Sequence, residues 1–388
     1  MVGKTFEAKG MSSVEKYYQV YTQRTRELKG EGRGIIGYLC ALTPAEIITA
    51  AGLIPFRIKG GVREPVTKAD AQMETLVCPL VRSCFDVTLK GTYDFLDGLV
   101  IPHACDSIAR TYEIWKYNLQ LPFSHYVNLP HTTSSSSLEF FKAELELFRK
   151  RLAGFVGREI TDDDLIKAIK AHNQNRAQIK KLYGLRKSDP PLISGVEMTM
   201  VLVAAMGLPV EESTQLVSSV VEQVEQRGSS SSGKLPRLMV LGGQIDDIAF
   251  IELVESSGAT VVTDELCPGT REYRPEVDTD KNPIDGLAER YLVKLSCSRT
   301  HRVEGETYHK YVEAMFGDIG HSVKDFKVDG VILYIYKYCD PLGFDAPVIK
   351  GYIESLGIPV LHLEDEYSIA SVGRLRTRVQ AFLEMIKR

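Results

Sequence analysis

The chain has 388 residues, enough for about two or three domains that each bury a core. Its hydrophobic content of 44% and charged content of 25% are typical of a soluble globular protein. The net charge of −4 gives no basic excess for phosphates, so nucleic acid is not expected as the main partner. No apolar run reaches the roughly 18 residues of a membrane span, and residues 1–10 lack the apolar core of a signal peptide.

Seven cysteines are scattered along the chain, an odd number without the spacing of a disulfide framework. This pattern fits a reducing compartment, so the expected location is the cytoplasm. In such a compartment, cysteines of this kind are more often metal ligands or catalytic groups than disulfide partners.

The first part of the chain predicts strand–helix–strand units, the seed of a doubly wound parallel sheet. It lacks a Gly-x-Gly-x-x-Gly turn, so the sequence does not indicate dinucleotide binding. Capping residues, apolar runs and turns predict these elements in order: a helix from the capping box of Ser12 and Glu15 to about residue 28, a strand at 34–40, a helix with Thr43 as N-cap and Pro44 at its first position, a strand at 54–58, a helix from Pro79 to about residue 91, a strand that ends at Cys105, a helix at 107–119 and a strand at 123–129.

The middle of the chain, residues 138–227, has mostly helical periodicity, and the Gly-Ser run at 228–233 predicts a flexible boundary. A second α/β series follows: a strand at 237–241, a helix at 247–256, a strand at 260–263, a buried strand within 324–338, a helix at 347–356, a strand at 359–363 and a helix at 372–386. The predicted fold class is therefore α/β, with two Rossmann-like parallel-sheet lobes and a helical segment between them. The predicted domains are an N-terminal helix at 1–33, a first lobe at 34–137, the helical segment and linker at 138–233, and a second lobe at 234–388.

One stretch of sequence occurs twice, once in each predicted lobe. Residues 97–106 read Asp-Gly-Leu-Val-Ile-Pro-His-Ala-Cys-Asp, and residues 329–340 read Asp-Gly-Val-Ile-Leu-Tyr-Ile-Tyr-Lys-Tyr-Cys-Asp. Each copy is an Asp-Gly turn, then an apolar run typical of a buried parallel strand, then Cys-Asp. Because ligands bind at the carboxyl ends of strands in open α/β sheets, Cys105 and Cys339 are predicted to share a site in the cleft between the lobes.

Cys78, Cys105 and Cys339 are each predicted to come directly before a helix, and Pro79 suits the first helical position after Cys78. Backbone N–H groups and the helix dipole at such N-termini favour a thiolate. Three thiolates, two from one lobe and one from the other, would suit an iron–sulfur cluster with one iron left open. Zinc also binds thiolates, and buried structural cysteines are common, so all three interpretations stay open on spacing alone.

The other cysteines are weaker candidates. Cys40 ends the first predicted strand near the same crevice, where it could support the site without binding metal. Cys84 lies over one and a half helical turns after Cys78 and is expected to point away from it. Cys267 and Cys297 fall in the less regular part of the second lobe and share no pattern.

Glu46 and His103 are the candidates for acid–base chemistry at the cleft. The helix that carries Glu46 opens at the carboxyl end of the first strand, and His103 follows the strand that leads to Cys105. Glu46 could instead complete a capping box with Thr43. His103, like His131 after the next strand, could be a hydrogen-bonded structural histidine.

Four segments together resemble subunits of the 2-hydroxyacyl-CoA dehydratases and benzoyl-CoA reductases. They are residues 37–53 with Gly-Tyr-Leu-Cys, Pro-Ala-Glu and Ala-Ala-Gly-Leu, residues 78–83 with Cys-Pro-Leu-Val-Arg-Ser, residues 103–107 with His-Ala-Cys-Asp-Ser, and residues 336–340 with Tyr-Lys-Tyr-Cys-Asp. The resemblance covers residues 12–388. Within the family, residues 101–107 and 128–131 look most similar to the smaller of the two cluster-bearing subunits of the ATP-dependent benzoyl-CoA reductases.

The resemblance implies a [4Fe–4S] cluster on Cys78, Cys105 and Cys339. It also implies a homologous cluster-bearing partner in a heterodimer, and a separate ATP-hydrolysing iron–sulfur activator that supplies low-potential electrons. This chain has no Gly-x-x-x-x-Gly-Lys-Ser/Thr loop, which is consistent with ATP being handled elsewhere. The implied reaction is reduction of the benzoyl-CoA ring to a cyclohexadienoyl-CoA, an oxygen-sensitive step in which the smaller subunit relays electrons.

Three other functions compete with this one. A 2-hydroxyacyl-CoA dehydratase subunit would use the same cluster and activator for radical elimination of water, a lyase reaction. A double-cubane cluster reductase, related to the same family, would need more cysteine ligands in each subunit. A non-enzymatic α/β binding protein would keep its thiols as buried structural groups.

Overall fold

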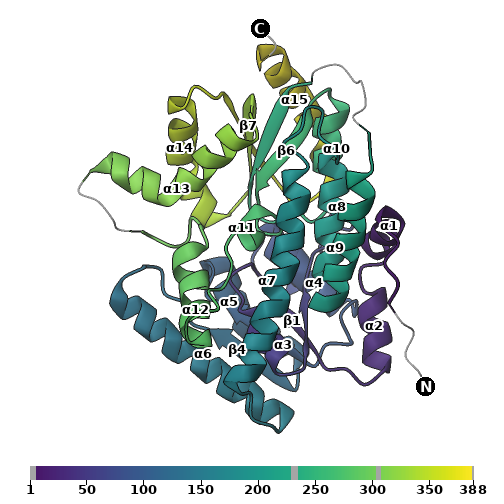
Figure 1. The fold of residues 1–388 in the computed structure, drawn as a ribbon, viewed down its shortest axis with the longest axis vertical. Helices are drawn as coiled ribbons and strands as arrows, with labels where there is room; N and C mark the ends of the chain where they lie inside the picture. Colours follow the sequence, from purple (N-terminus) through teal and green to yellow (C-terminus); the bar gives the residue numbers. More distant parts are fainter. Residues whose placement is uncertain (1–5, 229–234, 303–306, 387–388) are drawn as a thin grey trace.

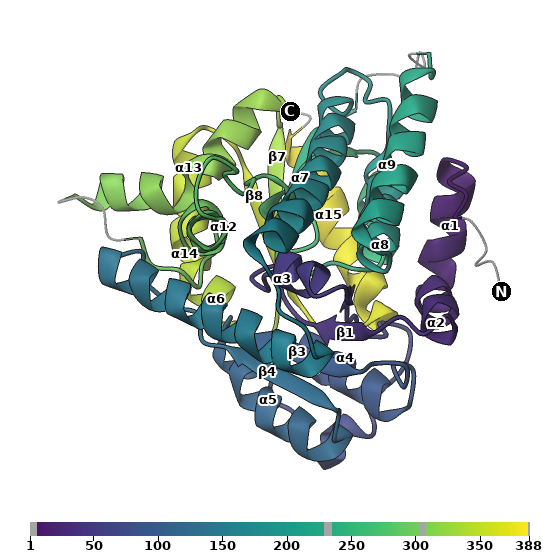
Figure 2. The same cartoon turned by 60° about the horizontal axis from the view of Figure 1, so that its bottom comes forward.

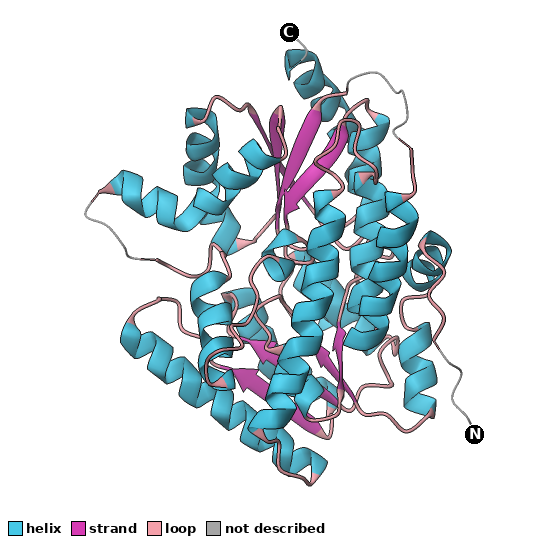
Figure 3. Cartoon of the chain, in the orientation of Figure 1, coloured by secondary structure: helices cyan, strands magenta, loops and turns pink. Residues whose placement is uncertain are grey.

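The computed structural model describes residues 6–228, 235–302 and 307–386. It confirms the predicted fold class, because it contains two four-stranded parallel sheets in an α/β arrangement (Figure 1; Figure 3). The sheets have the strand orders β2-β1-β3-β4 and β6-β5-β7-β8. Both therefore have the same topology, in which the first two strands of a lobe are neighbours and the third strand pairs with the first.

The first sheet and its helices occupy the first third of the chain. Their bounds are β1 Ile35–Tyr38, α3 Ala45–Ala50, β2 Ile54–Arg57, η1 Ala69–Ala71, α4 Pro79–Leu89, β3 Gly98–Pro102, α5 Asp106–Leu119 and β4 Phe123–Val127. The second sheet and its helices are formed by residues 237–386. Its elements are β5 Arg237–Gly242, α10 Ala249–Ser256, β6 Thr260–Glu265, α11 Thr270–Tyr273, α12 Pro283–Ala288, the π-helical turn η2 Glu289–Lys294, α13 Tyr308–Asp325, β7 Gly330–Tyr336, α14 Asp340–Ser355, β8 Val360–Asp365, η3 Ile369–Ser371 and α15 Val372–Ile386.

The repeated stretch forms equivalent strands, β3 in the first sheet and β7 in the second. A carboxylate oxygen of Asp97 accepts a hydrogen bond from the backbone N–H of Ile35, the first residue of β1, at 2.8 Å. Asp329 accepts the same bond from Arg237, the first residue of β5, at 2.8 Å. The aspartate of each Asp-Gly turn thus ties the third strand to the first strand of its lobe, which explains why the motif occurs in both halves.

Four helices form the predicted helical segment: α6 Ser135–Val156, α7 Asp162–Gly184, α8 Gly195–Met206 and α9 Val210–Glu225. Figures 1 and 2 show α7, α8 and α9 side by side. Capping boxes at Thr161 and Ser194 begin α7 and α8. Because α7 packs against α3 of the first sheet and α11 of the second, this layer links the two sheets.

Several predicted boundaries were wrong. The N-terminal helix is two helices, α1 Met11–Gln19 and α2 Gln23–Gly30, and the predicted capping box at Ser12 does not form because α1 already begins after Gly10. The chain turns between them, where the Tyr21 hydroxyl donates to the buried carbonyl of Arg57 at 2.6 Å. Most of the Gly-Ser run at 228–233 lies outside the described residues. Helix α14 begins at Asp340, seven residues before the prediction, and includes Pro347.

Among the described residues, no helix combines the length and the apolar character that crossing a bilayer requires.

Candidate functional site

The carboxyl ends of the two sheets face each other, and Arg57 shows how closely they meet. Arg57 is the last residue of β2, and its guanidinium donates to the Gln244 side chain, beyond the end of β5, at 3.0 Å. It also donates to the carbonyl of Cys267 at 3.4 Å and pairs with Glu272. The crevice expected at the strand ends therefore lies between the two sheets.

Cys78, Cys105 and Cys339 are the N-cap residues of α4, α5 and α14, as the sequence predicted. Their sulfur atoms accept hydrogen bonds from backbone N–H groups of the first helical turns: those of Leu80 and Val81 for Cys78, Ile108 for Cys105, and Leu342 for Cys339. Donors in this position stabilise negative charge on sulfur.

The structure brings these three thiols together from both lobes. Cys105 is close enough to Cys78 and Cys339 for each to raise its pKa, and Cys78 likewise raises the pKa of Cys339. Burial is the largest cause of the raised pKa in all three thiols. It raises the pKa of Cys339 to about 12. The backbone N–H donors lower the pKa of each thiol, as expected at helix N-termini, but desolvation by burial outweighs them. A bound metal would have to displace these protons.

A second group of thiols adjoins the first. Burial and the proximity of Cys267 and Cys297 raise the pKa of Cys40 to about 12, and Cys267 also raises the pKa of Cys297. The groups are contiguous, because Cys40 raises the pKa of Cys105, and Cys267 and Cys297 raise the pKa of Cys339. Six of the seven cysteines thus lie near one another between the sheets, and the seventh, Cys84, is linked to Cys78 alone, which raises its pKa.

Cys40 was expected near the crevice, but its grouping with Cys267 and Cys297 was not predicted, although part of the signal was present. Cys267-Pro268 repeats Cys78-Pro79, and Cys267 follows the carboxyl end of β6 as Cys40 follows β1. Cys40 adopts φ 69°, the left-handed region, which places it at a sharp turn away from its strand. Cys297 follows the π-helical turn η2, and no local pattern predicts its position.

The donor set at these thiols consists of cysteine sulfur atoms. Within the described ranges, no three His, Cys, Asp or Glu side chains converge tightly enough to hold one metal ion. A four-iron cluster needs no such convergence, because each of its irons takes its own cysteine. The cysteine-only donor set and the backbone N–H groups aimed at sulfur both fit an iron–sulfur cluster.

His103 and His131 form a pair at the carboxyl ends of β3 and β4. Their Nε2 atoms lie 3.5 Å apart, and their ring planes are nearly perpendicular. His131 Nδ1 lies 3.2 Å from the carbonyl of Arg299, and burial, Arg299 and His103 together lower the pKa of His131. His103 lies two residues before Cys105 in the chain, and its part in proton transfer stays a prediction.

Glu46 lies away from the thiols, in a buried ion pair. The helix N-cap is Pro44 and Thr43 instead bonds to Leu39, so the predicted capping box is wrong. The carboxylate of Glu46 is fully buried, pairs with Arg176 and accepts from the Tyr291 hydroxyl at 2.7 Å. Burial alone would raise the pKa of Glu46, but Arg176 and its cationic neighbours hold it well below the usual range. This environment favours a permanent carboxylate over a proton donor.

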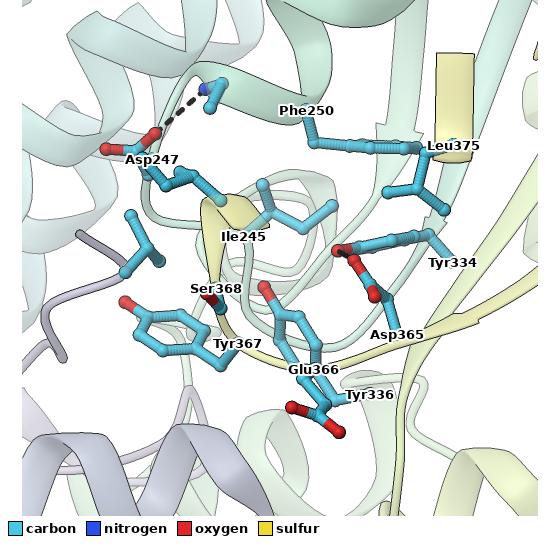
Figure 4. A pocket seen from close by; sticks show the side chains of 13 residues that line it. Ile245, Asp247, Phe250, Tyr334, Tyr336, Asp365, Glu366, Tyr367, Ser368 and Leu375 are labelled. Atoms are coloured by element: carbon cyan, nitrogen blue, oxygen red, sulfur yellow. Dashed lines mark hydrogen bonds between the residues drawn. The ribbon is translucent and has the colours of Figure 1, made fainter. Parts of the chain in front are cut away.

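Two cavities lie at the strand ends without including any of the six thiols. One, at the ends of β7 and β8, is nearly filled by the stacked rings of Phe250 and Tyr334 and by Tyr336 (Figure 4), and its volume of about 30 Å³ holds about one water. The other, of about 540 Å³, is lined from both lobes by residues that include Lys59 and Asp246. Its size is that of a small-ligand site.

Comparison with known proteins identifies the family. The family model described as 2-hydroxyglutaryl-CoA dehydratase, D-component, matches residues 40–386. The chain is 26% identical to the (R)-phenyllactyl-CoA dehydratase beta subunit of Clostridium sporogenes, covering 96% of this chain and 95% of that one. It is 27% identical to a benzoyl-CoA reductase subunit of Thauera aromatica (92% and 91%), and 28% identical to the putative dehydratase subunit YjiM of Escherichia coli K12 (93% and 93%).

The family match covers every strand of the two sheets except β1 and includes all six converging cysteines. These relatives have dehydratase and reductase names, and each is named as a subunit. The chain belongs to the 2-hydroxyglutaryl-CoA dehydratase D-component family.

Proposed function

We propose that this chain is an iron–sulfur subunit of a low-potential, oxygen-sensitive reductase, with a [4Fe–4S] cluster on Cys78, Cys105 and Cys339. The supporting observation is three cysteines from two lobes, each at a helix N-cap and each accepting backbone N–H bonds. Such a cluster supplies one-electron transfer when it is bound. The chain's own residues bind the irons, stabilise negative charge on sulfur and bury the site from water.

The convergence of six thiols is the observation that favours one kind of reductase. Cys40, Cys267 and Cys297 form a second group of three that adjoins the first. A single [4Fe–4S] cluster with three ligands leaves this second group without a role. The arrangement therefore best supports a double-cubane cluster reductase, in which each group of three cysteines holds four irons.

The second candidate is the smaller subunit of a benzoyl-CoA reductase, which relays electrons for reduction of the aromatic ring to cyclohexadienoyl-CoA. The similarity to the Thauera benzoyl-CoA reductase subunit over 92% of the chain favours it. A 2-hydroxyacyl-CoA dehydratase subunit is the third, because several relatives are named as dehydratases. In both cases the partners would be a homologous cluster-bearing subunit, an ATP-hydrolysing activator and an acyl-CoA, in the cytoplasm.

Serine substitution of Cys267 separates the first candidate from the other two. In anaerobically purified protein, Cys267→Ser is expected to lose about half of the iron, since it removes one ligand of the second group only. Cys84→Ser is the matched control, because Cys84 is a fully buried residue of α4 that adjoins Cys78 and no thiol of the second group. It is expected to retain all of its iron.

Full iron in Cys267→Ser would exclude the double-cubane proposal and leave a single cluster. Anaerobic assay with an activator then distinguishes the remaining candidates: benzoyl-CoA is reduced by one, and a 2-hydroxyacyl-CoA loses water in the other.

A further inference from the structure

Arg299 is a buried cation that joins the two lobes beside the thiols. Its side chain is 5% exposed. One Nη atom donates to the carbonyl of Leu129 at 2.8 Å, and the other donates to that of Pro130. Both acceptors follow β4 of the first sheet, whereas Arg299 itself lies two residues after Cys297 of the second lobe. Its guanidinium is thus fixed in place by neutral backbone groups.

No carboxylate among the described residues forms an ion pair with Arg299, and its Nε–H has no hydrogen-bond partner there. The ionisable groups that act most on its charge are the thiols of Cys297, two residues before it, Cys40 and Cys105, followed by the Tyr126 hydroxyl. A buried guanidinium without an anion is costly, because desolvation is not offset by an opposite charge. The local charge therefore becomes balanced only when these thiols carry an anionic group.

Arg271 is a second buried arginine that contacts the second thiol group directly. Its Nη1–H donates to Cys267 Sγ at 3.1 Å and to the carbonyl of Gly242 at 3.1 Å. Unlike Arg299, it has a carboxylate close by, since Glu265 lies 3.4 Å from its Nε. With Arg57, which pairs with Glu272, three buried arginines thus lie beside the second thiol group, and of these Arg299 alone has no carboxylate partner among the described residues.

We infer that Arg299 is a positioning residue that supplies the counter-charge for the anionic cluster held by the six cysteines and raises its reduction potential. This inference rests on the proposed function. The reduced cluster carries one more negative charge than the oxidised cluster, so a nearby cation stabilises the reduced form. The electron comes from an external low-potential reductant, and Arg299 keeps its proton and its hydrogen bonds throughout.

The test is a redox titration of the anaerobically purified wild-type protein with titanium(III), followed by electron paramagnetic resonance. Arg299→Gln is expected to lower the ratio of reduced to oxidised cluster about tenfold at a fixed potential, which equals 59 mV for a one-electron couple. A Coulomb interaction over roughly 12 Å at an effective dielectric constant near 20 has this size. Arg299→Lys retains the charge and is expected to keep most of the wild-type ratio.

Arg237→Gln is the matched control. Arg237 is 3% exposed and, like Arg299, donates to backbone carbonyls, including those of Phe326 and Ser188 at 2.9 Å. It is the first residue of β5, whereas the thiols lie beyond the carboxyl ends of the strands, at the opposite end of the sheet. Its loss is expected to lower stability and leave the potential unchanged.

The outcomes separate this inference from the proposed function. Wild-type protein without iron would overturn both. Iron present with the wild-type ratio in Arg299→Gln would overturn the inference alone, as would an equal shift in Arg237→Gln. If Arg299→Gln does not fold, Arg271→Gln replaces it, because Arg271 contacts Cys267 directly, and an unchanged ratio there overturns the inference equally.

Discussion

Replacing Cys105 with alanine is expected to abolish the iron bound by the first thiol group. Cys105 lies close to Cys78, Cys339 and Cys40, each of which raises its pKa. Its sulfur also receives a backbone N–H bond at the start of α5, which no alanine can accept. Cys78→Ala and Cys339→Ala are expected to have the same effect, measured as iron and acid-labile sulfide in anaerobically purified protein.

Thermal unfolding of the three alanine variants tests whether they lose iron while they remain folded. Each is expected to fold without metal, because its lobe has its own sheet and apolar core. Folded variants that keep full iron would show that these cysteines are structural thiols, contrary to the proposal.

Arg176→Met is expected to lower the free energy of unfolding by about 3–5 kcal/mol, the second large effect. It would leave the buried Glu46 carboxylate with only the Tyr291 hydroxyl as a direct partner. Because the pKa of Glu46 is depressed on folding, the stability from this pair is present above the ordinary carboxyl range and is lost as the pH falls. Urea unfolding at pH 7 and at lower pH measures both the loss and its sign.

Arg26→Met is the matched control for this prediction. Its guanidinium pairs with Asp94 at 2.7 Å, but both side chains are largely exposed. Such a surface pair contributes about 1 kcal/mol or less. If both variants lose the same free energy of unfolding, burial does not make the Glu46–Arg176 pair more stabilising than a surface pair. A large loss of activity with full stability in Arg176→Met would instead favour the predicted acid–base role of Glu46.

The repeated Asp-Gly…Cys-Asp stretch could be recognised from sequence because its signals are local. A turn, an apolar run and a helix start each depend on neighbouring residues, so the strands β3 and β7 and the N-cap positions of Cys105 and Cys339 were predicted correctly. The role of the two aspartates in anchoring the first strand of each lobe emerged only from the structure.

Contacts between distant segments could not be predicted in this way. Glu46 and Arg176 are 130 positions apart, and only the packing of α7 against α3 brings them together. Cys297 joins Cys40 because a π-helical turn ends beside the opposite lobe, and helix α13 was missed within a segment that lacked clear capping signals. The domain boundaries stay predictions.

The most direct test of the account is the iron and acid-labile sulfide content of the full chain, purified without exposure to air. Six converging thiols in two groups predict about eight iron atoms per chain, twice the number in one [4Fe–4S] cluster. About four would restrict the metal to Cys78, Cys105 and Cys339 and favour the benzoyl-CoA reductase or dehydratase alternatives. Zinc in place of iron, or no metal at all, would contradict the cluster proposal and assign the six cysteines a structural role.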